Sequence, residues 1–194
     1  MKVLMINGSR REKMCTYTAL KIIADTLAEE GIESEIVFTG ARAVNGEMND
    51  LVKELAEKAK DADGLIVGSP VYYASPSGEV LALMDRLMAA AGPDLINKPG
   101  AAVCSARRAG TTASIDVLNK YFQFNRMPVV SSMYWNMVHG NTPEDVMKDE
   151  EGVQIMQMLG RNMAWLLKSI EAGRKAGIGA PGLENRSCTD SIGN

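Results

Sequence analysis

The 194-residue sequence has few cysteines, little net charge and no long apolar run, and each shortage excludes a class of protein. Cys15, Cys104 and Cys188 lie far apart, so they form neither a CxxC motif nor a disulfide framework. A formal net charge of −3 leaves no basic excess for nucleic acid or an anionic membrane surface. No stretch approaches the ~20 apolar residues of a membrane span, and the four-residue apolar run near the start is far shorter than the apolar segment of a signal peptide, about 7 to 15 residues. We therefore expect a cytoplasmic protein without nucleic-acid or membrane partners.

Several nucleotide- and phosphate-binding motifs are also missing. There is no GxxxxGK[ST] and no GxGxxG, and Thr39 stands where a dinucleotide fold would place an acidic ribose clamp. A phosphatase of similar topology would need an arginine six positions after its cysteine, but Lys21 follows Cys15 and Gly110 follows Cys104 at that spacing. These absences argue against the corresponding enzymes.

Histidine is equally scarce. His139 is the only one, so a Ser-His-Asp triad or a histidine metal site would have to be built around it. We interpret it as an ordinary loop histidine and predict no metal site.

Apolar runs and helical periodicities alternate along the chain. We predict strands at residues 3–6, 36–38, 65–67, 101–104 and 129–130, the last extending towards Trp135, and amphipathic helices through residues 20–28, 48–59, 80–88, 115–122 and 156–170. Parallel strands need right-handed helical crossovers, so this rhythm predicts a doubly wound α/β fold with a five-stranded parallel sheet of order 2-1-3-4-5. Residues 1–175 form one predicted domain, 136–152 its longest interior loop, and 176–194 an extended tail.

In such a sheet, ligands bind outside the carboxyl ends of the strands, where the strand order reverses. Three loops, at residues 8–18, 69–78 and 105–112, are expected to meet there. The first leads into a helix N-terminus, whose backbone N–H groups attract a phosphate. Ser9, Thr16, Thr18 and an arginine could complete the seat. A simpler alternative is an ordinary helix with Thr16 as its N-cap.

The second loop carries the sequence Gly-Ser-Pro-Val-Tyr-Tyr at 68–73, followed by Ser-Pro-Ser-Gly at 75–78 and by Asp85-Arg86. Together with Gly8-Ser9, Arg11 and Thr16, this pattern resembles the flavodoxin-like NADPH-dependent FMN reductases. The third loop, Ser105 to Thr112, is similar to that of members that bind FMN between subunits. The resemblance spans roughly residues 1–175.

The resemblance implies a flavodoxin-like fold and a set of FMN-binding residues. Those implied around the phosphate, along the flavin ring and in the third loop are Ser9, Arg11, Cys15, Thr16, Thr18, Pro70, Val71, Tyr72, Tyr73, Ser105, Ala106, Arg107, Arg108 and Gly110. Arg107 and Arg108 have two functional interpretations: one of them could lie near the flavin N1/O2 edge, or could bind the 2′-phosphate of NADPH. The simpler alternative is that both are solvated surface arginines. Tyr134 and Trp135 are implied at the substrate side. Trp135 could cover the flavin face from a partner subunit, or could instead be a core aromatic. We expect Trp135, the loop 136–152 and the tail to contribute to a subunit interface beside the flavin.

The chain also departs from relatives of that family. The related iron–sulfur flavoproteins carry a compact cysteine cluster after the second strand, whereas residues 39–49 contain no cysteine. We therefore predict no iron–sulfur cluster. The segment 186–192 distantly resembles a family C-terminus that crosses to a neighbouring subunit.

The resulting hypothesis is an FMN-dependent oxidoreductase. It would pass electrons from NADPH or NADH through FMN to a quinone, nitro, azo or flavin acceptor, and would act as a homodimer or homotetramer. The alternatives are a flavodoxin-type electron carrier without enzymatic turnover and a flavin-binding regulatory protein. Carriers of that type are usually strongly acidic, so the small net charge argues mildly against the first alternative.

Overall fold

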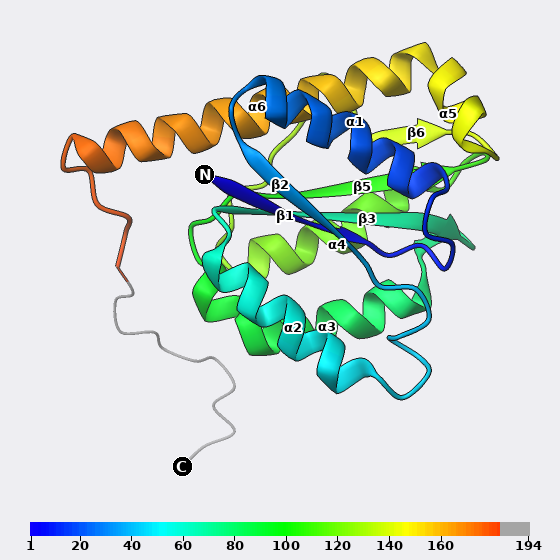
Figure 1. Ribbon diagram of the computed structural model, residues 1–194, viewed down its shortest axis with the longest axis horizontal. Helices are drawn as coiled ribbons and strands as arrows, with labels where there is room; N and C mark the ends of the chain where they lie inside the picture. The colour runs from blue at the N-terminus through cyan, green and yellow to red at the C-terminus, as the bar shows by residue number, and fades with distance from the viewer. Residues whose placement is uncertain (183–194) are drawn as a thin grey trace, which may run out of the picture.

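The computed structural model describes residues 1–182, which form a central sheet covered by helices on both faces (Figure 1). The strands are β1 (Lys2–Asn7), β2 (Glu33–Phe38), β3 (Gly64–Tyr72), β4 (Ser75–Pro76), β5 (Gly100–Ala106) and β6 (Met137–His139). The helices are α1 (Cys15–Glu29), α2 (Met48–Asp61), α3 (Gly78–Leu95), α4 (Thr111–Phe124), α5 (Pro143–Lys148) and α6 (Glu150–Lys175). Among the described residues, no helix is both long and apolar enough to cross a membrane.

The parallel strands follow the order β2-β1-β3-β5-β6, with β4 paired antiparallel to β3. This arrangement confirms the predicted doubly wound sheet of order 2-1-3-4-5, and its β1/β3 switch point is where a ligand is expected. The central strands are apolar on both sides because α1 and α6 cover one face while α2, α3 and α4 cover the other (Figure 1).

The fifth parallel strand differs from its expected position. Val129 makes only an isolated bridge to Gly100, and the chain then leaves the sheet before pairing again along β5 as β6. The Asn136 amide closes the base of this excursion by donating to the Val130 carbonyl oxygen at 3.3 Å. The apolar pair at 129–130 thus marks the start of the pairing, and the strand proper lies at 137–139.

Residues 136–152 do not form the long loop expected of them. They contain β6 and α5, and α6 begins at Glu150 rather than near Met156. The Thr142 hydroxyl accepts from the Asp145 amide in a capping box, and the Asp149 carboxylate accepts from the Gly152 amide. The polar residues of this segment, which are typical of a loop, therefore begin two successive helices.

The second predicted loop is largely a strand. β3 continues through Ser69 and Pro70 to Tyr72 and turns back to pair with Ser75. Tyr73 and Ala74, with φ of 53° and 57°, form the two-residue connection. Positive φ at both positions is the geometry of a type I′ hairpin, which glycine or asparagine normally adopts.

The last part of the predicted tail lies outside the described residues, and so does the segment 186–192 considered for exchange between subunits. Before that point, the Arg126 guanidinium donates to the Pro181 carbonyl oxygen at 3.2 Å.

Candidate functional site

A cavity of about 160 Å³ lies where the carboxyl ends of β1, β3 and β5 meet. Its lining comes from the three predicted loops and from the turn after β6. The lining residues are Ser9, Arg11, Met14, Cys15, Thr16, Pro70, Val71, Tyr72, Ser105, Ala106, Arg107, Gly140 and Asn141. We call this cavity the switch-point pocket.

The buried side chain of Asn7, at the end of β1, organises the first loop. Its Oδ1 accepts from the Ser9 amide at 3.2 Å, and its Nδ2 donates to the Glu12 carbonyl oxygen at 2.8 Å. The Ser9 hydroxyl in turn accepts from the Arg11 amide at 3.2 Å. Asn7 was missing from the predicted site; a buried asparagine directly after an apolar strand is the signal that could have found it.

The N-terminus of α1 opens onto the pocket without a side-chain cap. Met14 occupies the N-cap position and makes no capping hydrogen bond, so the first backbone N–H groups of the helix keep their donor capacity. The alternative of Thr16 as N-cap is wrong, because the Thr16 hydroxyl instead shares a buried 2.8 Å hydrogen bond with the Ser105 hydroxyl. The Thr18 hydroxyl points back to the Met14 carbonyl oxygen at 3.2 Å and does not line the pocket.

Cys15 connects the start of α1 to the turn after β6. Its Sγ donates to the Gly140 carbonyl oxygen at 3.5 Å. Burial raises the pKa of the Cys15 thiol, so at neutral pH this group is a neutral thiol and not a thiolate. Gly140 and Asn141 were not predicted at the site, because β6 had been placed too early in the sequence.

The hairpin formed by β3 and β4 makes the opposite rim. Pro70, Val71 and Tyr72 line the pocket, whereas the Tyr73 side chain at the tip is fully exposed. Gly110 does not line the pocket; it is the N-cap of α4 with φ of 107°, and a Cβ there would lie 2.9 Å from the Ala74 Cα. Glycine at this position thus lets the hairpin tip pack on the start of α4.

Two cations face the pocket. Arg11 and Arg107 both line it, and neither forms an ion pair within residues 1–182. Arg108 is exposed beside them but is not part of the lining. By contrast, the neighbouring Arg10 is engaged with Glu79, with 3.0 Å between Nε and Oε1. The pocket therefore combines helix N–H donors with two available positive charges.

The two aromatic residues predicted at the substrate side lie outside the switch-point pocket. Tyr134 and Trp135 pack edge to face, with ring centroids 4.6 Å apart, and line a separate cavity of about 290 Å³ between α4 and residues 129–136. Both are half exposed, so Trp135 is not a core residue. Within one chain, the structure does not bring them to the switch-point pocket.

His139 lies at the end of β6, where its backbone amide donates to Asp149 Oδ2 at 2.6 Å. The Asp149 carboxylate is also 3.8 Å from His139 Nδ1. Among residues 1–182, no three His, Cys, Asp or Glu side chains gather as they would around a metal ion.

Comparison with known proteins identifies the family of this chain. The family model described as NADPH-dependent FMN reductase matches residues 1–142 of the chain. The chain belongs to this family. An iron-sulfur flavoprotein of Methanocaldococcus jannaschii is 31% identical over 192 residues, covering 88% of this chain and 100% of the relative. An FMN-dependent NADPH-azoreductase of Staphylococcus aureus is 32% identical over 98 residues, covering 45% and 52%.

Solved structures show the same fold at low sequence identity. An archaeal flavodoxin aligns with a TM-score of 0.64 at 18% identity, covering 87% of this chain and 99% of the other. An NAD(P)H:quinone oxidoreductase of Methanothermobacter marburgensis aligns with a TM-score of 0.65 at 16% identity, covering 84% and 98%. The flavodoxin-like fold implied by the sequence is thus confirmed.

Family membership defines the general chemistry of this member. It is an NAD(P)H-dependent FMN oxidoreductase whose cofactors are FMN and NADPH. The switch-point pocket fits the phosphate end of FMN, because an uncapped helix start beside the Arg11 guanidinium offers the N–H donors and the positive charge that a phosphate dianion binds.

Proposed function

We propose that the switch-point pocket holds FMN and that this FMN carries electrons from NADPH to a small aromatic acceptor of the quinone, nitro, azo or flavin class. The observation that supports the proposal best is the uncapped N-terminus of α1, which opens beside Arg11. An unsatisfied helix start is stabilised by an anion, and the FMN phosphate is the anion that this family would place there.

The phosphate would lie against the backbone N–H groups of the first α1 turn. Ser9 and Thr16 contribute hydroxyls, Cys15 a backbone amide and Arg11 a guanidinium. The hydrogen bond between Thr16 and Ser105 joins the first and third loops within the pocket lining. Because Cys15 is a neutral thiol, it adds no negative charge that would repel the phosphate.

The flavin ring would lie along Pro70, Val71 and Tyr72, with Tyr73 at the outer rim. When bound, FMN supplies the hydride and electron chemistry, and the chain supplies position and polarity. The pocket of one chain, at about 160 Å³, is smaller than the roughly 300 Å³ or more of most ligand sites. A second subunit would therefore close the open side, and Tyr134 and Trp135 are aromatic residues suited to such a wall.

Arg107 and Arg108 follow β5 at the same edge of the sheet. Arg107, which lines the pocket, is the better candidate for the 2′-phosphate of NADPH, while Arg108 lies further out. A cation beside the ring would alternatively favour the negative charge that the flavin gains on reduction.

The rate of flavin reduction by NADPH distinguishes an enzyme from an electron carrier. We expect that stopped-flow mixing of the FMN-loaded protein with NADPH bleaches the flavin absorbance rapidly, and that adding a quinone or azo acceptor restores it over repeated turnovers. Bleaching too slow to support turnover with any of these acceptors would contradict the proposal and favour a flavodoxin-type carrier or a regulatory flavoprotein.

A further inference from the structure

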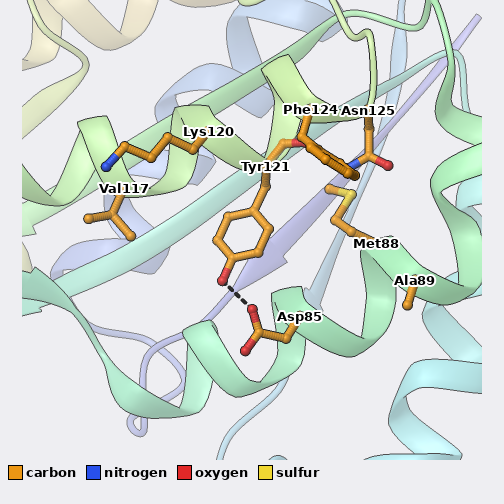
Figure 2. Close-up of a pocket in the computed structure, with 8 residues that line it drawn as sticks. All are labelled: Asp85, Met88, Ala89, Val117, Lys120, Tyr121, Phe124 and Asn125. Atoms are coloured by element: carbon orange, nitrogen blue, oxygen red, sulfur yellow. Dashed lines mark hydrogen bonds between the residues drawn. The ribbon is translucent and has the colours of Figure 1, made fainter. Parts of the chain in front are cut away.

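Helix α4 lines cavities on two of its sides. The larger, of about 510 Å³, lies towards α3, and its polar groups are paired, since the Tyr121 hydroxyl donates to Asp85 Oδ1 at 2.5 Å (Figure 2). The smaller, of about 290 Å³, lies between α4 and residues 129–136, and we call it the 129–136 cavity. Its lining residues are Ile115, Asn119, Val129, Val130, Ser131, Ser132, Met133, Tyr134, Trp135 and Asn136. None of them lines the switch-point pocket, so FMN bound there leaves the 129–136 cavity unexplained.

Two buried amide oxygens of this lining have no hydrogen-bond partner. Among residues 1–182, the buried side-chain oxygen and nitrogen atoms without a partner are Asn119 Oδ1 and Asn136 Oδ1. Asn136 is only 6% exposed, and its Nδ2 already donates to the Val130 carbonyl oxygen, so its free group is the acceptor. A buried acceptor without a partner destabilises a fold, and native proteins contain few of them. Two such acceptors at one cavity indicate a ligand that carries hydrogen-bond donors.

The lining also determines the charge of that ligand. Within the described chain, none of the residues that line the 129–136 cavity has a charged side chain. The Ser132 hydroxyl is engaged as well, because it donates to the Ile155 carbonyl oxygen at 2.6 Å. A cation would lose its hydration here without meeting a counter-charge, which is costly. The cavity therefore suits a neutral molecule with N–H or O–H donors.

The rest of the lining is apolar and aromatic. Ile115, Val130 and Met133 contribute aliphatic side chains. Tyr134 and Trp135 add two rings that pack edge to face. An apolar cavity of roughly 150 Å³ binds one benzene molecule, and a water molecule occupies only about 30 Å³ of liquid. A cavity of about 290 Å³ thus admits a molecule of one or two aromatic rings, whereas a single water would leave its apolar part unfilled.

We propose that the 129–136 cavity is a second binding site, for a small neutral aromatic amine. The ring of the ligand packs among the apolar side chains beside Tyr134 and Trp135, and its amino group donates to Asn119 Oδ1 and Asn136 Oδ1. One amino group carries two N–H donors, which is the number that the two acceptors require. An aromatic amine is uncharged at neutral pH, whereas an aliphatic amine is protonated and would enter this cavity as an unpaired cation.

The test is a titration of the full-length, FMN-loaded protein, labelled with nitrogen-15, followed by NMR. The chain has two tryptophans, Trp135 in the cavity and Trp165 on α6, and the variant Trp165→Phe assigns their indole N–H signals. We expect 4-methylaniline to shift the Trp135 signal saturably and to leave the Trp165 signal in place. The matched probe 1,4-dimethylbenzene has the same shape without N–H donors. It should bind at least about tenfold more weakly, because both acceptors stay unpaired.

A variant of the helix side of the cavity gives a second measurement. Asn119→Leu removes one acceptor at nearly constant volume and should raise the dissociation constant of 4-methylaniline about tenfold. It should not lower the Tm, because an apolar group replaces an acceptor without a partner. The control Gln123→Leu removes an exposed amide from the same helix outside the cavity and should leave the dissociation constant unchanged.

Several results would overturn the proposal. One is a Trp135 signal that does not move with millimolar 4-methylaniline, with or without a change in flavin absorbance that places the amine at the FMN. Equal affinities for 4-methylaniline and 1,4-dimethylbenzene would show that the two amides take no part in binding. An unchanged dissociation constant in Asn119→Leu would lead to the same conclusion. The comparison of the two probes needs only wild type, so it decides the question even where a variant does not fold.

Discussion

Neighbouring arginines in the first loop have different surroundings, and this difference decides which of them can bind an anion. Arg10 is engaged with Glu79, whereas Arg11 lines the switch-point pocket and has no carboxylate partner in the described chain. The charge of Arg11 is therefore available to a ligand, while that of Arg10 is largely offset.

The first prediction follows from this difference. Arg11→Ala should weaken FMN binding by roughly 1.5 to 3 kcal/mol, the contribution of a hydrogen bond to a charged group. Arg10→Ala removes the same charge one position earlier and should have a much smaller effect. Titration of the apoprotein with FMN, followed by flavin fluorescence, measures both. Equal losses for the two variants would mean that only general charge attraction is involved.

The two arginines after β5 allow a similar comparison. If Arg107 grips the 2′-phosphate of NADPH, Arg107→Ala should reduce the preference for NADPH over NADH, as a ratio of kcat/KM, about tenfold, which corresponds to ~1.4 kcal/mol. Arg108→Ala should change it less. The flavin midpoint potential is measured in the same variants. A more negative potential in Arg107→Ala with an unchanged nucleotide preference would place this cation at the flavin ring instead.

Among the structural elements, the hairpin of β3 and β4 has the most unusual backbone. Tyr73 and Ala74 both adopt the left-handed conformation, in which a side chain costs about 1 to 2 kcal/mol per residue. Strain of this kind is common beside functional sites, and this hairpin carries three residues of the pocket lining.

Relief of that strain should stabilise the protein. Ala74→Gly is expected to raise the free energy of unfolding by up to about 1 kcal/mol, because glycine adopts positive φ without a steric penalty. The exposed mid-helix substitution Ala90→Gly in α3 should lower it by about 1 kcal/mol, which shows that glycine is not stabilising in general. Urea unfolding measures both. A loss of stability in Ala74→Gly would indicate that the tip is unstrained.

Two ion pairs connect Glu35 of the edge strand β2 to neighbouring elements. Glu35 accepts from Lys2 Nζ at 2.6 Å and from Lys58 Nζ at 2.5 Å, and these hydrogen bonds lower the pKa of its carboxyl. Because the unfolded chain then binds the proton more readily, the stabilisation is present above the unfolded value near 4.5 and disappears as the pH falls through the folded value.

Glu35→Gln should therefore reduce the free energy of unfolding at pH 7 by about 0.5 to 1 kcal/mol, a modest figure because the pairs are partly exposed. The difference from wild type should shrink as the pH is lowered below 4.5. Glu33→Gln, on the same strand but without an ion pair in the described chain, serves as the control. A difference between wild type and Glu35→Gln that is the same at pH 7 and pH 3 would show that charge is not its cause.

At the scale of the whole molecule, periodicity and strand composition were enough to predict the sheet order and the loops that form the switch-point pocket. They failed where strand pairing is interrupted. Val129 and β6 both pair with β5, but the residues between them leave the sheet, and no local sequence pattern indicates this interruption. For the same reason Gly140 and Asn141 were missed at the site. The positions of Tyr134 and Trp135 relative to the pocket depend on tertiary packing, which a one-dimensional pattern does not contain.

The lining of the switch-point pocket also predicts which flavin cofactor binds. The helix-start residues in the lining, Met14 to Thr16, all belong to α1, so the pocket offers a seat for one phosphate. FMN at 100 times its dissociation constant should add about 2.7 kcal/mol to the free energy of unfolding, which raises the Tm by roughly 5 to 10 °C for a chain of this size. FAD at the same concentration should raise it less, because its phosphates form a diphosphate diester with one negative charge each, whereas the terminal phosphate of FMN is a monoester that carries close to two. Differential scanning fluorimetry compares the two, with riboflavin as the control that lacks the phosphate. A larger shift with FAD, or equal shifts with riboflavin and FMN, would show that the N-terminus of α1 is not the phosphate seat.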